Sequence, residues 1–155
     1  MKRSETTTFT VQEALRDEAP EIIALADVHR DELGAIIQHR KWLFQRVERG
    51  EVFVARTDEG KVIGFVVFSH QSLSGQENTT VNYLCTSKEH RGKGAATLLM
   101  EAVASDARIR GKRSIELKCP AHAPANQFYQ TIGYELRQSE TDREGNPLNV
   151  WTMRL

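Results

Sequence analysis

Hydrophobic and polar positions change their spacing several times along the chain, and each change predicts a different element. Phe9 and Val11 alternate with threonines, which predicts a short strand. Apolar residues then recur at helical spacing, which predicts a helix capped by Asp17 with Pro20 in its first turn. A second helical pattern follows and ends at Gly50. The first third of the chain is therefore predicted to be one strand and two helices.

The remainder of the chain alternates strands with two further helices. Alternating or continuous apolar runs predict strands at residues 52–55, 62–68, 81–85, 114–119, 134–136 and 148–155. Helical spacing predicts helices at 95–103 and 125–132. The run 62–68 has no polar interruption, so we expect a central strand buried on both faces. The pattern predicts one α/β domain of the α+β type over residues 1–155, with frayed residues 1–6 and helices packed on a mostly antiparallel sheet.

Composition narrows the classes of function. Lys plus Arg number 21 and Asp plus Glu number 21, so the formal net charge is zero and no general attraction to nucleic acid or anionic membranes is expected. No apolar run approaches the length of a membrane span, and the N-terminal residues lack the apolar core of a signal peptide, so we expect a cytoplasmic protein. Cys85 and Cys119 are expected to be reduced thiols, and no Cys/His cluster has the spacing of a metal site.

One turn carries candidate chemistry. The segment Arg91–Ala96 contains two glycines and leads directly into the helical pattern that starts at Ala95. The first amides of a helix have no partners within the helix, and its macrodipole places partial positive charge there, so such a turn can hold a phosphate. The alternative is a tight connection whose glycines only relieve backbone strain. The spacing matches neither the dinucleotide-binding nor the P-loop fingerprint.

The stretch Leu84–Leu99 resembles the acetyl-CoA motif of the Gcn5-related N-acetyltransferases (GNAT family). That motif is commonly written [QR]-x-x-G-x-[GA], and Arg91, Gly94 and Ala96 take its three defined positions. The resemblance implies a six- to seven-stranded sheet flanked by about four helices, and acetyl-CoA as cofactor. It implies that the backbone of the turn holds the pyrophosphate and that the preceding strand end pairs with the pantetheine arm. The cofactor-binding residues implied in this way are Leu84, Cys85, Thr86, Arg91, Gly92, Lys93, Gly94, Ala95, Ala96, Thr97, Asn126 and Tyr129.

A second segment of the same family lies further along. Ala125–Tyr134 resembles its motif A-x-x-[FL]-Y-x-x-x-G-[FY]. The resemblance makes Tyr129 the general acid that protonates the leaving thiolate, and places Asn126 near the pantetheine or the phosphates. Taken alone, Tyr129 would more often be a core aromatic. His122 departs from the asparagine that is common at its position, and we expect it to be a loop residue.

The catalytic base is less clearly marked. Relatives often place a carboxylate on or near the fourth strand, whereas residues 79–86 contain none. Glu116 on the following strand is the tentative base, and His70, Glu77, His122 or a chain of water molecules are alternatives. A covalent route through either cysteine is disfavoured, because neither has a visible base beside it.

The sequence therefore predicts an N-acetyltransferase that moves an acetyl group from acetyl-CoA to a primary amine of a small molecule or peptide, by direct attack in a ternary complex. The alternatives are a non-catalytic acyl-CoA-binding regulator and a plain α/β binding domain. Trp42, Phe44 and Trp151 could line the acceptor site, although core packing is their preferred role. The acidic residues Asp27, Asp31 and Glu32 are a weak hint of a polyamine acceptor. By resemblance, a homodimer is possible.

Overall fold

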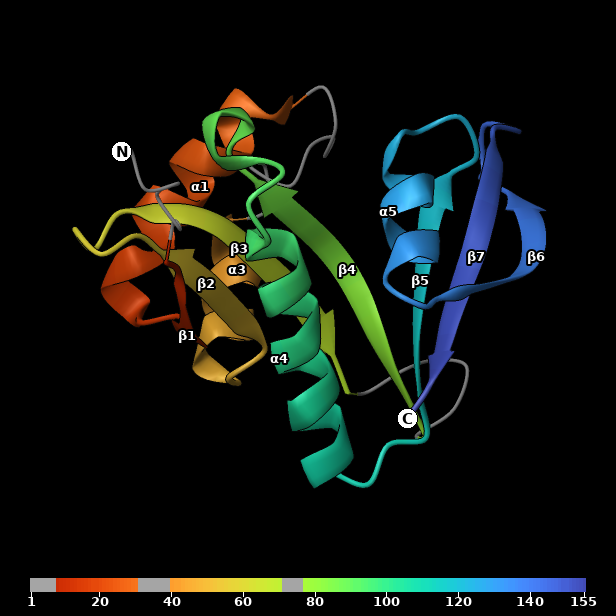
Figure 1. The fold of residues 1–155 in the computed structure, drawn as a ribbon, viewed down its shortest axis with the longest axis horizontal. Coiled ribbons are helices and arrows are strands. Elements are labelled where there is room, and N and C mark those ends of the chain that lie inside the picture. The colour runs from red at the N-terminus through yellow and green to blue at the C-terminus, as the bar shows by residue number, and fades with distance from the viewer. Residues whose placement is uncertain (1–7, 31–39, 71–76) are drawn as a thin grey trace, which may run out of the picture. The chain divides into compact units, whose positions relative to one another are not determined.

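The structure is a computed structural model, and it describes residues 8–30, 40–70 and 77–155. Figure 1 shows its helices and strands in chain order. The elements are β1 (Thr10–Glu13), the 3-10 helix η1 (Arg16–Glu18), α1 (Ala19–Val28), α3 (Arg40–Glu48), β2 (Val52–Arg56), β3 (Val62–Ser69), β4 (Asn78–Thr86), the 3-10 helix η3 (Lys88–His90), α4 (Ala95–Ile109), β5 (Ser114–Pro120), α5 (Ala125–Thr131), β6 (Glu135–Thr141) and β7 (Pro147–Arg154).

The strands form one seven-stranded sheet in the order β1-β2-β3-β4-β5-β7-β6. Strands β4 and β5 pair in parallel, whereas β1–β2, β2–β3, β5–β7 and β6–β7 pair antiparallel. The described residues contain four α-helices, which together with the mostly antiparallel sheet confirm the predicted fold class. The prediction for 62–68 is also confirmed, because β3 is buried along nearly its whole length. Strand β4 begins at Asn78, earlier than the pattern indicated.

Contacts within the chain divide it into two compact units. Unit 1 comprises Met1–Val67 and Tyr83–Ala102, and unit 2 comprises Phe68–Asn82 and Val103–Leu155. In unit 1, the apolar faces of α1 and α3 pack on β2, β3 and the end of β4. The buried residues of this cluster are Ala14, Ile22, Ala26, Leu43, Val47, Val52, Val54, Val62, Phe65, Val67 and Cys85. Part of the second predicted helical pattern, residues 31–39, lies outside the described residues.

The start of α1 differs from its prediction. Asp17 does not cap the helix; it lies within η1, and the residue at the N-cap of α1 is Glu18, with Pro20 in the first turn. The Glu18 side chain accepts a hydrogen bond from the Leu15 amide at 2.8 Å and binds the Arg56 guanidinium. Glu18 is buried, so this ion pair fixes where the chain leaves η1. The cap prediction was wrong because a contact with a strand 38 residues away decides the local geometry.

In unit 2, β7 lies between β5 and β6 and pairs with both along its length. Helix α5 follows β5 after a loop over residues 121–124, and it ends before Gly133, whose φ of +101° allows the turn into β6. Strand β6 bulges between Leu136 and Gln138. The bulge is a feature that the sequence pattern did not predict.

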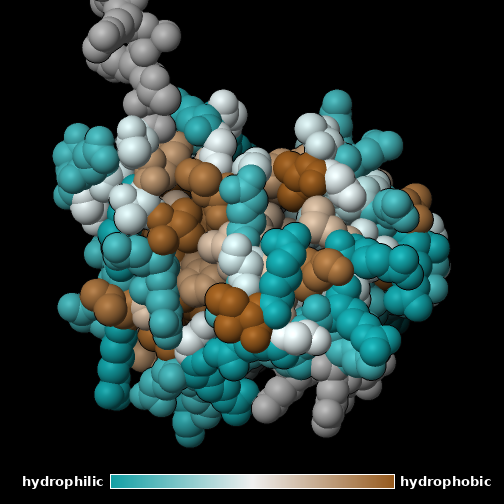
Figure 2. All heavy atoms as spheres, turned by 60° about the horizontal axis from the view of Figure 1, so that its bottom comes forward, coloured by the Kyte–Doolittle hydropathy of each residue, from teal (hydrophilic) through white to brown (hydrophobic). Residues whose placement is uncertain are grey.

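The surface carries hydrophobic side chains in several separate groups among hydrophilic ones, as Figure 2 shows for one face. Five large hydrophobic residues are exposed in the described part of the chain, and two of them, Leu98 and Ile109, share the helix α4. The five are Leu15, Val28, Leu98, Ile109 and Leu136. Such scattered exposure is ordinary for a folded domain. Within α4, Leu98 is 38% exposed, whereas Met100 is buried.

Close packing at Gly64 of β3 leads to a first prediction. A Cβ at this position would lie 3.1 Å from the Cys85 carbonyl oxygen and 3.3 Å from Leu99 Cδ1. Because both neighbours are buried, Gly64→Ala should push β4 away from β3 and destabilise the protein by about 1–3 kcal/mol. Urea unfolding measures this change. A free energy of unfolding equal to that of the wild-type protein would contradict the packing argument.

Candidate active site

The turn between β4 and α4 has the geometry of an anion cradle. Gly92 and Gly94 have φ angles of +76° and +91°, which side chains rarely adopt, and helix α4 starts directly afterwards at Ala95. The Leu98 amide donates to the Gly94 carbonyl at 3.0 Å. The amides of the first helical turn therefore precede this bond and are directed toward the turn, where the macrodipole favours an anion.

The residues of this turn fit a pyrophosphate. A Cβ at Gly92 or Gly94 would meet nothing within 4 Å, so the space in front of the backbone is open. Thr86, at the end of β4, is buried, and its Oγ1 has no hydrogen-bond partner among the described residues. An unsatisfied buried hydroxyl is costly, and a polar ligand group at the strand end would relieve it. Among the predicted cofactor-binding residues, Gly92 and Gly94 thus offer open backbone, and Thr86 offers an unpaired hydroxyl.

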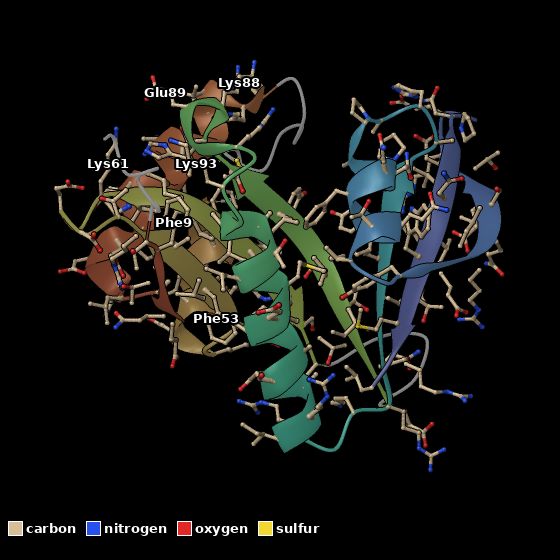
Figure 3. The ribbon with its side chains drawn as sticks, viewed as in Figure 1. Phe9, Phe53, Lys61, Lys88, Glu89 and Lys93 are labelled. Atoms are coloured by element: carbon tan, nitrogen blue, oxygen red, sulfur yellow. The ribbon has the colours of Figure 1, made fainter. Side chains whose placement is uncertain are left out.

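Basic side chains flank the cradle. Arg91 is exposed, and its Nε donates to the Thr86 carbonyl oxygen at 3.2 Å, which ties the start of the turn to the strand end. Lys93 lies between the two glycines and is exposed. Figure 3 shows Lys88, Glu89 and Lys93 in the loop that leads into α4. Positive charge is therefore available beside the helix N-terminus for a polyanionic ligand.

Tyr129 lies on α5 in unit 2 and is 8% exposed. Its ring packs edge-on against Phe128, with centroids 5.4 Å apart, and lies 6.1 Å from the ring of Tyr134. Burial, and secondarily Cys119, raises the pKa of the Tyr129 phenol well above its ordinary value. The phenol therefore stays protonated throughout the neutral range, and it can donate a hydrogen bond at any pH at which the protein works.

The Asn126 side chain is used within unit 2. Its Nδ2 donates to the carbonyl oxygens of Pro120 and Ala123 at 2.8 Å each, and its Oδ1 accepts from Trp151 Nε1 at 2.8 Å and from Asn149 Nδ2 at 3.1 Å. These bonds hold the loop after β5, and with it the start of α5, against β7. They give Asn126 a structural role that the sequence did not indicate, and its predicted contact with the cofactor stays a prediction.

Glu116 lies on β5 in register with Thr80 of β4 and Thr152 of β7. The next residue, Leu117, is in register with Trp151, whose indole bonds to α5. Side chains alternate along a strand, so Glu116 lies on the sheet face opposite α5. Its side chain is 15% exposed and accepts a hydrogen bond from Arg137 Nη1 at 3.1 Å.

The other proposed bases have different surroundings. His70 is buried between Thr79 Oγ1 at 2.8 Å and Asp106 Oδ2 at 2.7 Å, so both ring nitrogens are occupied. Glu77 is exposed and pairs with Arg113 at 3.7 Å. His122 is exposed in the loop between β5 and α5, as its loop interpretation predicted. Glu116 is the candidate that combines partial burial with a position on the strand beside β4.

Cys85 and Cys119 are both buried, and no disulfide bond joins them. Cys119 is 5% exposed, and burial raises the pKa of its thiol. A raised pKa lowers the thiolate fraction that a covalent acetyl-cysteine would need. In the part of the chain that the structure describes, no group of three or more His, Cys, Asp or Glu side chains could hold a metal ion. Across the same residues, no helix is both long and apolar enough to span a membrane.

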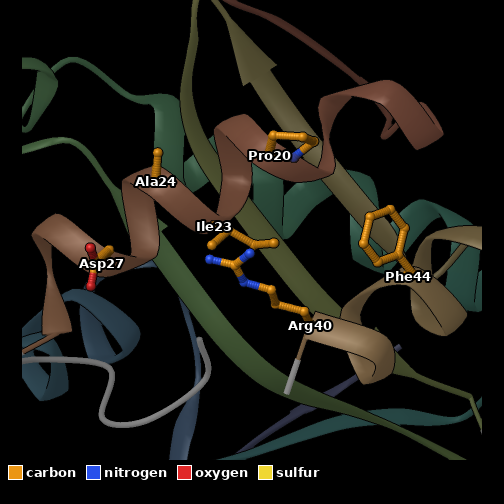
Figure 4. A pocket seen from close by; sticks show the side chains of 6 residues that line it. All are labelled: Pro20, Ile23, Ala24, Asp27, Arg40 and Phe44. Carbon is orange, nitrogen blue, oxygen red and sulfur yellow. The ribbon is translucent and has the colours of Figure 1, made fainter. Parts of the chain in front are cut away.

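A shallow pocket of about 360 Å³ lies in unit 1 on α1 and α3, and Figure 4 shows its lining. The lining combines apolar side chains with one acid and one base; its residues are Pro20, Ile23, Ala24, Asp27, Arg40 and Phe44. Phe44 is thus a pocket residue, whereas Trp42 packs against the core and lies edge-on to Tyr83 at 5.8 Å. Trp151 is buried, so core packing is confirmed for it. Asp31 and Glu32 lie outside the described residues.

Comparison with known proteins agrees with this geometry. A family model described as "Acetyltransferase (GNAT) domain" matches residues 48–136, which is more than half of the chain. An uncharacterized N-acetyltransferase of Methanocaldococcus jannaschii is 30% identical over 102 residues. That alignment spans 63% of this chain and 44% of the relative, so this chain matches less than half of the relative's length.

Solved structures share the fold. Ard1 of Thermoplasma volcanium has a TM-score of 0.80 at 16% identity, with 95% of this chain and 97% of that chain covered. N-acetylglutamate synthase of Neisseria gonorrhoeae, solved with coenzyme A and N-acetyl-glutamate, has a TM-score of 0.77 at 15% identity. That match covers 97% of this chain and 36% of the synthase. The family match, together with the open glycine turn at the start of α4, shows that the chain belongs to the GNAT family of acetyltransferases, whose cosubstrate is acetyl-CoA.

Proposed function

We propose that the chain is an N-acetyltransferase that acetylates a primary amine of a small molecule or peptide by direct transfer from acetyl-CoA. The observation that carries the proposal is the open turn at Gly92 and Gly94, where the backbone amides of α4 begin. In this proposal, amides from Gly92 to Thr97 bind the pyrophosphate, and Arg91 and Lys93 add charge beside it. The buried Thr86 Oγ1 and the backbone of Leu84 and Cys85 bind the pantetheine arm.

The bound acetyl-CoA supplies an activated thioester carbonyl, and the protein's groups supply position and charge. A backbone amide near Leu84 or Cys85 donates to the carbonyl oxygen as negative charge develops there. The amine nitrogen forms a bond to the carbonyl carbon while the carbon–sulfur bond breaks, and the nitrogen loses a proton to the base. Holding the two reactants together accounts for much of the expected rate acceleration.

Tyr129 acts on the departing sulfur by hydrogen bonding. A thiol has an ordinary pKa of about 8.5, and the pKa of the buried phenol is raised above its ordinary value of about 10. Full transfer of the phenolic proton to the thiolate is therefore unfavourable, whereas donation of a hydrogen bond is not. The role proposed for Tyr129 therefore differs from the general acid that the family resemblance implied. Tyr129 donates a hydrogen bond that stabilises the thiolate, and solvent then supplies the proton.

Glu116 is proposed as the base. Parallel pairing places it beside Thr80 of β4, the strand that lacks a carboxylate of its own. Arg137 Nη1 donates a hydrogen bond to Glu116 Oε2 at 3.1 Å and holds this carboxylate in place on its strand. Asn126 is proposed to act near the cofactor through the loop that its side chain holds.

Glu116→Gln is expected to lower kcat/KM for the amine about 10²-fold, because a positioned general base contributes a factor of this order. The defect should shrink as pH rises, since more of the amine is then already neutral. Steady-state rates from pH 6 to pH 10 measure both effects. Glu135→Gln is the matched control. Glu135 is an exposed residue of β6, in register with Thr152 of β7. A pH-independent defect, or the same defect in both variants, would remove Glu116 as the base.

The second candidate function is a non-catalytic acyl-CoA-binding regulator, which the lack of Asp and Glu on β4 favours. A panel of primary amines, with detection of free coenzyme A and of the acetylated product by mass spectrometry, separates the two. The enzyme proposal predicts an acetylated product for at least one class of amine. Binding of acetyl-CoA without any product across polyamines, amino acids and peptide N-termini would support the regulator.

A further inference from the structure

A buried histidine links α1 to the loop that enters the cofactor turn. His29 follows the last turn of α1 and is 3% exposed. Its Nε2 accepts a hydrogen bond of 3.2 Å from the backbone amide of Lys88, which lies 59 residues away at the start of η3. Its Nδ1 lies 2.9 Å from the Leu25 carbonyl oxygen. The imidazole therefore bridges a helix carbonyl and a loop amide.

These partners determine the form of the ring. A backbone amide can only donate, so Nε2 of His29 must present a lone pair to Lys88. A carbonyl oxygen can only accept, so Nδ1 must carry the proton and donate it to Leu25. The ring is therefore neutral, and both of its nitrogens are used. Neither nitrogen has capacity left for another role, which indicates that the bridge itself is the function of this side chain.

The loop that His29 holds leads directly to the cradle. On one side of Lys88, the Ser87 amide donates to the Ile63 carbonyl of β3 at 2.8 Å. On the other side, the ring of His90 lies edge-on to Phe9, with centroids 6.4 Å apart. Two residues further along, Gly92 begins the turn of positive φ angles. The bond from His29 thus fixes the middle of a short connection between the strand end and the turn.

We infer that His29 is a positioning residue of the cofactor site, which holds the Lys88 amide and thereby the approach to the Gly92–Gly94 turn. This inference rests on the proposed cofactor role of that turn. A ligand held by backbone amides depends on where those amides lie, so loss of the bridge should weaken acetyl-CoA binding more than the chemical step. The expected loss of affinity is about three- to tenfold, the usual range for one hydrogen bond.

The test compares His29→Leu, which keeps an apolar side chain but removes both bonds, with His29→Gln, whose amide oxygen can still accept from Lys88. Calorimetric titration with acetyl-CoA should show a three- to tenfold higher Kd for His29→Leu and recovery of most of that loss in His29→Gln. The kcat at saturating acetyl-CoA should change less than twofold. Amide exchange measured by NMR should accelerate at Lys88 in the leucine variant. Ile22→Val, a core change in α1, is the control for a general loss of stability.

A double-mutant cycle isolates the bond. Lys88→Pro removes the donor amide, and proline is tolerated at the first position of a helix. In that background, His29→Leu should leave the Kd for acetyl-CoA unchanged. Equal affinity of wild type and His29→Leu, or an equal loss in Ile22→Val, would overturn this inference alone. Failure of the wild type to bind acetyl-CoA would instead overturn the proposed function on which it rests.

Discussion

Gly94→Glu is expected to abolish acetyl-CoA binding, with a loss of affinity of about 10²-fold or more. The substitution places a carboxylate where the amides of α4 and its macrodipole favour an anion. It also replaces a residue with φ of +91°, where a side chain costs about 1–2 kcal/mol. The added Cβ meets nothing within 4 Å, so the fold should persist. A thermal-shift titration measures the result, because a ligand that binds the native state raises the melting temperature.

Gly60→Glu is a closely matched control for this experiment. Gly60 lies in the turn between β2 and β3, its φ is +84°, and a Cβ there also meets nothing within 4 Å. The variant therefore carries the same backbone strain and the same added charge, away from the cradle. It should lose a similar amount of stability and keep the full shift with acetyl-CoA. Equal loss of the shift in both variants would mean that strain, and not the cradle, explains the effect.

Tyr129→Phe is expected to leave the Kd for acetyl-CoA within about twofold and to lower kcat about 10- to 10²-fold, consistent with the loss of one charge-assisted hydrogen bond. The ring contacts with Phe128 and Tyr134 do not need the hydroxyl, so packing is kept. Because burial raises the pKa of the phenol, wild-type activity should show no alkaline limb from Tyr129 up to about pH 10. Calorimetry and steady-state rates measured over pH 6–10 check these statements together.

Tyr134→Phe is the control for Tyr129→Phe. Tyr134 is also buried with a raised pKa, and its hydroxyl has no hydrogen-bond partner among the described residues. Its removal should leave kcat unchanged and raise the free energy of unfolding by about 1 kcal/mol, because an unsatisfied buried hydroxyl is lost. A similar drop in kcat for both variants would point to disturbed packing around α5 and would exclude a specific role of the Tyr129 hydroxyl.

Sequence periodicity predicted correctly those elements in which the spacing of apolar residues matches the pattern of buried side chains. The uninterrupted apolar run from Val62 became β3, and the alternation after Ser114 became β5. The turn at Gly92 and Gly94 could also be predicted, because positive φ angles favour glycine and the start of a helix follows a recognisable pattern. The residues proposed to hold the pyrophosphate therefore come from one continuous segment, and their role in binding stays a prediction.

The groups that the sequence did not reveal depend on pairing between distant segments. Arg137 of β6 donates to Glu116 of β5 across the intervening strand β7, so the order of the strands in the sheet decides this contact. His29 meets Lys88 across 59 residues, and Asn126 meets Trp151 across 25. These partners are set by the tertiary fold and not by local sequence, so the spacing of residues along the chain did not predict either contact.

The central claim is that the glycine turn at the start of α4 binds acetyl-CoA for acetyl transfer. The most direct measurement is calorimetric titration of the wild-type chain and of Gly94→Glu with acetyl-CoA under identical conditions. The account predicts saturable binding of about one acetyl-CoA per wild-type chain, as one cradle requires, and no measurable binding by the variant. Equal affinity of the two proteins, or no binding by the wild type, would contradict it.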